Sequence, residues 1–83
     1  MTAGDVHTVY HLGLGWLNVV VGTGAAGRAC RHKHDAVKRG QRIARENRAE
    51  HLIHDLEGRI EERISYRPLE WAEPPFATEP ADA

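Results

Sequence analysis

The chain contains one cysteine, five aromatic residues and no long run of apolar residues among its 83 positions. Cys30 cannot form an internal disulfide bond by itself, and disulfides are typical of oxidising compartments. A membrane-spanning helix needs about 20 consecutive apolar residues, and a secretory leader needs a cationic start followed by an apolar stretch. Since the sequence shows neither pattern, we expect a cytoplasmic protein that does not enter a membrane.

An overall excess of one charge is also missing, because the formal net charge is only -1. The charges are nonetheless distributed unevenly. Residues 28–48 carry eight cations against two anions, whereas residues 49–83 carry nine anions against three cations. A chain of this length forms one domain with a small core. We therefore expect a basic region and an acidic region on the same small protein.

The first quarter of the chain favours a β-hairpin. Residues 5–11 alternate β-branched and aromatic residues with polar ones, which is typical of a half-buried strand. Two glycines mark a short turn, and a second apolar run follows over residues 16–21. The glycine-rich segment 22–27 then predicts a flexible connection, and residues 28–31 predict a short third strand.

The period of the apolar residues changes between residues 34 and 48 and predicts the one helix. At about 100° per residue, small and apolar side chains fall on one stripe and cations fall on the opposite side. The stripe comprises Ala36, Val37, Gly40, Ile43 and Ala44, and the opposing cations are Lys38, Arg42 and Arg45. Gly40 lowers the helix propensity, so we expect the helix to approach the sheet closely at this position.

A second hairpin is predicted after the helix. Residues 51–55 form a short apolar strand, Glu57 and Gly58 a tight turn, and residues 59–65 an alternating strand. Together the elements predict an α+β fold with a single antiparallel sheet (β-hairpin, helix, β-hairpin) and one amphipathic helix packed on one face. The sheet residues expected to face the helix are Val19, Val21, Leu52 or Ile53, Ile60 and Ile64.

The C-terminal residues differ in composition from the rest of the chain. Residues 67–83 contain all four prolines, an excess of acids and no periodicity. We therefore predict a folded domain over residues 1–66 and a disordered, acidic, proline-rich tail over residues 67–83. Trp71 and Phe76 are the aromatic residues with which this tail could dock on the sheet or on a partner.

Several motifs of the chain occur together in a known family. They are the histidine-rich first strand, Gly15-Trp16, Asp35-Ala-Val-Lys-Arg-Gly40, Leu52-Ile-His54, Gly58-Arg-Ile60 and Ser65-Tyr66. With these motifs, residues 6–66 resemble a family of small, uncharacterised bacterial proteins, domain of unknown function 2188. The resemblance implies the layout of hairpin, helix and hairpin, and it implies no established activity or catalytic residue.

Gly22, Gly24 and Gly27 follow an apolar run with the spacing of a dinucleotide-binding loop. The doubly wound sheet that uses this loop needs more strands than 83 residues can supply, and a hairpin before the loop has no place in it. We therefore interpret these glycines as a plain connection, and we predict neither a cofactor nor a small-molecule substrate.

Metal binding and nucleophilic catalysis are not favoured either. The histidine pairs are His7 with His11, His32 with His34, and His51 with His54. A structural zinc site takes four ligands, commonly several cysteines, and only one thiol is present. Cys30 and His32 could act as nucleophile and base, but no third group orients them. Glu61 and Glu62 are neighbours on a strand and should point to opposite sides. We predict no metal site, no catalytic residue and no enzyme.

The basic helix face is the strongest functional signal, because cations clustered on one face can contact phosphates. The candidate nucleic-acid-binding residues are Arg28, Arg31, Lys33, Lys38, Arg42 and Arg45. The sequence thus predicts a small non-enzymatic binding module for nucleic acid. The alternative is a protein-interaction or inhibitor protein that uses a sheet edge or the tail, with a protein partner or as a homo-oligomer. In that case the cations form a solvated face or pair with the acids of the tail.

Overall fold

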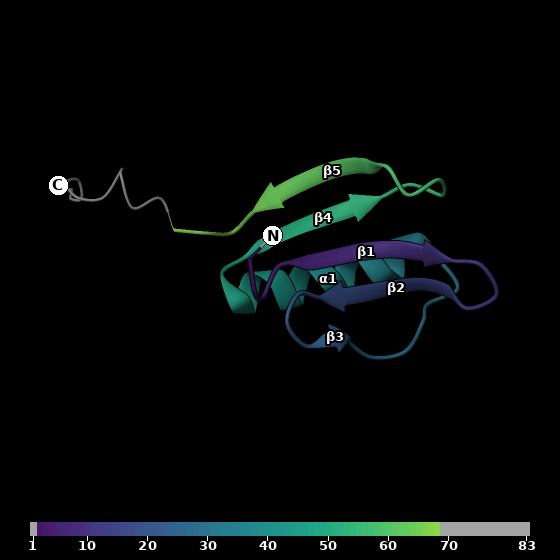
Figure 1. Cartoon of the computed structure of the whole chain (residues 1–83), viewed down its shortest axis with the longest axis horizontal. Helices are drawn as coiled ribbons and strands as arrows, with labels where there is room; N and C mark the ends of the chain where they lie inside the picture. The colour runs from purple at the N-terminus through teal and green to yellow at the C-terminus, as the bar shows by residue number, and fades with distance from the viewer. Residues whose placement is uncertain (1, 69–83) are drawn as a thin grey trace, which may run out of the picture.

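A mixed five-stranded sheet and one helix make up residues 2–68, the part of the chain that this computed structural model describes (Figure 1). The elements are β1 (Val6–His11), β2 (Gly15–Val20), β3 (Gly24–Ala25), α1 (Lys33–Asn47), β4 (Glu50–His54) and β5 (Ile60–Ser65). The strands lie in the order β3-β2-β1-β4-β5, and α1 packs on β1, β2 and β4. The α+β class predicted from the sequence is therefore confirmed.

The prediction of a single antiparallel sheet is wrong, because β4 runs parallel to β1. After β2, the chain runs back along the sheet until Cys30 forms an isolated bridge with Trp16. Helix α1 begins near the end of the sheet that carries Trp16. It ends near the start of β1, where the Asn47 side chain donates to the Gly4 carbonyl over 3.1 Å. The next strand must therefore leave in the same direction as β1. Local periodicity carries no information about this direction.

The segment between β2 and α1 also differs from the prediction. The third strand is Gly24–Ala25, within the segment predicted as a flexible connection, and residues 28–31 contribute only the bridge of Cys30. Gly22 and Gly24 adopt φ values of 100° and 94°, which let the chain reverse at once after β2. The order is therefore three strands, a helix and two strands rather than hairpin, helix and hairpin.

The core register in β2 is shifted by one residue from the prediction. Val20 packs with Val6 and Ala44 in the core under the helix, while Val19 pairs with His7 on the other face of the sheet. The buried row of β2 is Trp16, Asn18 and Val20. The polar Asn18 stands in the middle of this row and hides the true alternation from a hydrophobicity pattern.

A β-bulge in β5 overturns a further expectation. Ile53 pairs with Glu62 and His54 pairs with Ile60, so Glu61 is an extra residue on β5. As a result, Glu61 and Glu62 line the same hollow beside α1 instead of pointing to opposite sides. Ile60, which was expected to face the helix, is 53% exposed.

The end of the sheet at which β1 begins is closed by a polar network around Asp5. The Asp5 carboxylate is buried and accepts hydrogen bonds from the backbone N–H groups of Thr2 and Glu50. Arg67, the first residue of the predicted tail, donates to Asp5 over 2.7 Å. Residues 69–83, with Trp71 and Phe76, lie outside the described residues, so the disorder of the tail stays a prediction.

The close approach of helix and sheet at Gly40 is confirmed. A Cβ atom at this position would lie 2.4 Å from Oδ1 of Asn18 and 2.7 Å from Nε2 of His51. Ala36 and Ala44, one turn to either side, are fully buried. The stripe of small residues thus lets the helix backbone rest directly on polar side chains of the sheet.

Replacing Gly40 by alanine should therefore destabilise the protein, although alanine improves helix propensity by about 0.8–1.0 kcal/mol. We expect a net loss of about 1–3 kcal/mol in the free energy of unfolding, because the sheet side chains have no room to move aside. Urea denaturation measures this loss. Glu46→Ala on the exposed side of α1 is the control and should stay within about 0.5 kcal/mol. A Gly40→Ala variant as stable as the control would contradict the close approach.

Candidate functional site

Three of the six predicted cationic contacts lie together on the exposed face of α1. Lys38, Arg42 and Arg45 occupy successive turns and are exposed, whereas Ala36 and Gly40 on the opposite stripe are buried. With a rise of about 1.5 Å per residue, these cations span about 10 Å along the helix axis. We refer to Lys38, Arg42 and Arg45 as the basic helix face.

The basic helix face has no carboxylate partner within residues 2–68. The lysine and arginine residues that form ion pairs with described carboxylates are Lys33, Arg59, Arg63 and Arg67. Arg45 makes one further contact, with its guanidinium carbon 5.9 Å from the centroid of the Tyr66 ring. Lys38, Arg42 and Arg45 are therefore not held in ion pairs by the described part of the fold.

The other three predicted contacts occupy different positions. Arg28 and Arg31 are exposed in the segment before α1, and the Arg28 carbonyl accepts a hydrogen bond from Arg39 over 3.3 Å. Lys33 instead forms an ion pair with Glu61, and its Nζ lies 5.2 Å from the centroid of the Trp16 ring. The structure thus brings together three cations of the helix and directs Lys33 towards the sheet.

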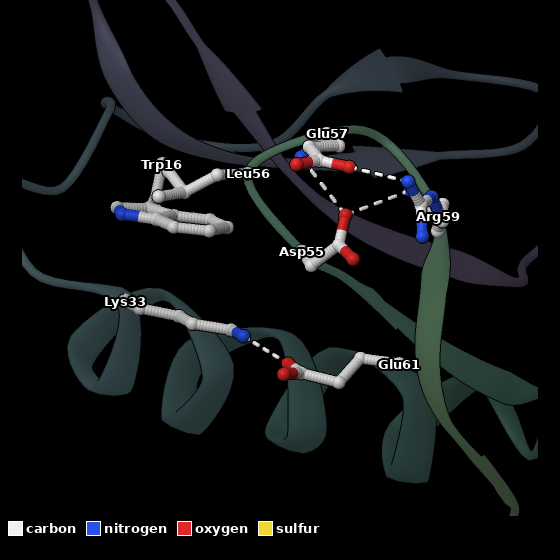
Figure 2. A pocket seen from close by; sticks show the side chains of 7 residues that line it. All are labelled: Trp16, Lys33, Asp55, Leu56, Glu57, Arg59 and Glu61. Carbon is white, nitrogen blue, oxygen red and sulfur yellow. Dashed lines mark hydrogen bonds and ion pairs between the residues drawn. The ribbon is translucent and has the colours of Figure 1, made fainter.

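Lys33 lines a hollow of about 460 Å³ between β2, the start of α1 and the turn from β4 to β5 (Figure 2). The residues around this hairpin-end pocket are Trp16, Lys33, Asp55, Leu56, Glu57, Arg59 and Glu61. In Figure 2 the side chain of Leu56 extends beside the Trp16 indole, while Lys33 reaches Glu61 below them.

The charged groups of the hairpin-end pocket are already paired within the chain. Arg59 donates to Glu57 over 2.6 Å, and Lys33 pairs with Glu61. The Asp55 carboxylate accepts from the backbone N–H groups of Arg59 and Glu57, both over 2.9 Å, and the first of these bonds is the main cause that lowers the pKa of Asp55. The exposed apolar surface of the pocket therefore comes mainly from Leu56, because Trp16 at its edge is only 7% exposed.

A chain of polar side chains is buried between the sheet and α1. Thr8, Asn18 and His51 are at most 2% exposed. The Asn18 amide donates to the Ala36 carbonyl over 2.9 Å, and its Oδ1 accepts from the Thr8 hydroxyl over 2.6 Å. Since the single Thr8 proton is used in this way, Nε2–H of His51 must donate to Thr8 Oγ1 over 2.7 Å. Nδ1 of His51 then carries a lone pair, buried and without a hydrogen-bond partner in the described residues.

This arrangement keeps His51 neutral. A proton added at Nδ1 would place a charge in a buried site with no acceptor, and burial, followed by the charge of His7, lowers the pKa of His51. The Thr8 hydroxyl next to it lies fully under the helix, where no substrate reaches it. The cluster therefore contributes to the packing of α1 on the sheet.

His51 and His54 point to opposite faces of the sheet, as predicted. His54 donates from Nδ1 to the Gly58 carbonyl over 3.1 Å, so its Nε2 accepts from Nδ1 of His7 over 2.9 Å. Burial, followed by the charge of His54, lowers the pKa of His7. Within residues 2–68, no three His, Cys, Asp or Glu side chains converge in a way that could hold a metal ion.

A family model for uncharacterised proteins conserved in bacteria, DUF2188, matches residues 6–66. The chain belongs to the DUF2188 family. The matched segment runs from the first residue of β1 to Tyr66, just after β5, and it includes the basic helix face and the hairpin-end pocket. No curated protein and no solved structure is significantly similar to the chain. No helix within residues 2–68 is long and apolar enough to cross a membrane.

The buried polar chain and the hairpin-end pocket were not predicted from the sequence. Thr8 and Asn18 face each other across the first hairpin, but His51 lies 43 residues after Thr8, so no spacing in the sequence indicates its contact with them. The pocket had a weak signal in the two leucines of the first turn and in Leu56 of the second, since large apolar residues are unusual at turn tips.

The lowered pKa values of His51 and His7 predict that the protein becomes less stable in mild acid. An unfolded histidine has a pKa of about 6.5, so the stabilising contribution of a neutral buried histidine is fully present above this pH and is lost as the pH falls. The free energy of unfolding in urea should therefore decrease between about pH 7.5 and about pH 5.

The variant His51→Gln should show a shallower pH dependence, with the remainder coming from His7. Losing the buried donor should also cost about 1–3 kcal/mol at neutral pH. His34→Gln, at a position with a 74% exposed side chain, is the matched control and should keep the wild-type slope. A wild-type stability that is constant or rises towards acid pH would contradict the neutral state of His51.

Proposed function

We propose that the protein binds nucleic acid, or a polyanion of similar charge density, through the basic helix face. One observation carries this proposal: Lys38, Arg42 and Arg45 are exposed on one side of α1 and have no carboxylate partner within residues 2–68. Cations that are not neutralised by their own fold are free to replace the counterions of a phosphate backbone.

The packing of α1 on the sheet favours the same interpretation. The buried stripe of α1 lies on β1, β2 and β4, so the basic helix face is held on a regular element rather than on a loop. Arg28 and Arg31 continue the positive surface before the helix, and the contact from Arg39 to the Arg28 carbonyl ties this segment to α1. Within residues 2–68, no exposed aromatic side chain belongs to this face, which favours contacts to phosphates over sequence-specific contacts.

The test is the salt dependence of binding to mixed DNA and RNA, measured by fluorescence anisotropy. Each phosphate contact contributes about 0.7–0.9 to the slope of log K against log salt. The variant K38A/R42A/R45A should therefore flatten this slope by about 2–3 and weaken binding at low salt. Arg42→Ala alone should flatten the slope by about one contact.

The control for Arg42→Ala is Arg59→Ala. This variant also removes one exposed positive charge, but from the segment between β4 and β5 and not from the basic helix face. It should leave the slope unchanged. A chain ending at Arg67 tests whether the acids of residues 68–83 compete for the same face, in which case it binds more tightly than the full chain. Absence of binding at low salt by both chains, or equal slopes for Arg42→Ala and Arg59→Ala, would overturn the proposal.

A further inference from the structure

Large apolar side chains are exposed at only one end of the described structure. The residues concerned are Tyr10, Leu12, Leu14, Leu56 and Ile60. They belong to the turn from β1 to β2 and the turn from β4 to β5, or to the strand ends beside these turns. Both turns lie at the end of the sheet opposite to the N-terminus and to the segment after β5 (Figure 1). Clustered apolar exposure of this kind marks an interaction surface.

The turn from β1 to β2 is a neutral, protruding apolar tip. Leu12 is 84% exposed and Leu14 is 60% exposed, and a Cβ atom at Gly13 between them would meet nothing within 4 Å. Residues 6–27 contain no Asp, Glu, Lys or Arg. This tip therefore enters an apolar environment without removing a formal charge from water.

The hairpin-end pocket at the same end suits such a tip. Its apolar surface comes mainly from Leu56, which is 69% exposed, with a small contribution from Trp16, which is 7% exposed. Its charges are paired as Lys33 with Glu61 and Arg59 with Glu57, so the pocket does not demand a charged ligand. The volume of about 460 Å³ is in the range of pockets that hold a small ligand, so the tip of a turn is not too large for it.

From this complementarity we infer that the occupant is a second copy of the chain. In the resulting dimer, the Leu12–Leu14 turn of one copy enters the hairpin-end pocket of the other copy. Tip and pocket lie at the same end of the molecule, so a two-fold axis makes both contacts at once and closes the assembly at two copies. The buried surface covers the apolar side chains that the isolated chain leaves in water.

The local charge argues against an anionic membrane surface as the occupant. Asp55 and Glu57 flank Leu56 in the second turn, so a negatively charged bilayer would repel the segment that has to insert. The inference does not rest on nucleic-acid binding, because none of Lys38, Arg42 and Arg45 lines the hairpin-end pocket.

Sedimentation equilibrium of the full chain tests the inference between about 1 µM and about 1 mM, the range of weak to moderate dimers. The average mass should rise from 9.3 kDa towards twice this value. The variant L12S/L14S lacks the tip, and Leu56→Ser lacks part of the pocket, so each should stay monomeric at concentrations where the wild type is dimeric. Ala25→Ser, exposed at the opposite edge of the sheet, is the control and should dimerise like the wild type.

Mixing the two defective variants distinguishes insertion of the tip into the pocket from non-specific hydrophobic association. L12S/L14S keeps its pocket and Leu56→Ser keeps its tip, so the mixture should form a heterodimer through one of the two contacts. Far-UV circular dichroism verifies that each variant is folded. A wild type that stays monomeric over the whole concentration range overturns the inference. This holds also if the monomer binds anionic vesicles through Leu12 and Leu14. A dimer that persists in L12S/L14S also overturns it.

Discussion

The contact between Gly40 and the polar side chains beneath it is the constraint on which the rest of the structure depends. Because position 40 has no side chain, α1 lies close enough for Asn18 to donate to the Ala36 carbonyl. Thr8 and His51 complete the buried chain of hydrogen bonds, which places a proton on Nε2 of His51, and the buried Nδ1 without an acceptor keeps the ring neutral. A small domain with few large core side chains thus aligns its helix by directed hydrogen bonds as well as by apolar burial.

This alignment determines which face of α1 is turned to solvent. With Ala36, Gly40 and Ala44 against the sheet, Lys38, Arg42 and Arg45 fall on the far side, and none of them forms an ion pair with a described acid. Several described acids pair with cations of the sheet side: Asp5 and Glu50 bind Arg67 at one end of the sheet, and Glu61 binds Lys33 near the other. The separation of charge along the sequence therefore becomes a separation in space.

Features that depend on local sequence could be predicted, and features that depend on topology could not. The period of 3.6 residues located α1 to within one residue at each end and indicated that Lys38, Arg42 and Arg45 share a face. It also indicated the close approach at Gly40. The direction of β4 depends on where the helix returns the chain, and the bulge at Glu61 depends on pairing with Ile53. Lys33 was grouped with the other cations because periodicity at the first turn of a helix does not reveal a partner on a distant strand.

The two ends of the sheet differ in a way that connects the two proposed surfaces. One end is closed by the Asp5 network, whereas the other exposes neutral leucines around a pocket whose charges are already paired. Pairing of two copies through the apolar end leaves Lys38, Arg42 and Arg45 of each copy uncovered, because these side chains lie outside the pocket. A dimer would thus carry two basic helix faces, and binding of the first to a polyanion would raise the effective concentration of the second. The weak affinity expected from three cations would then increase without any new contact to the polyanion.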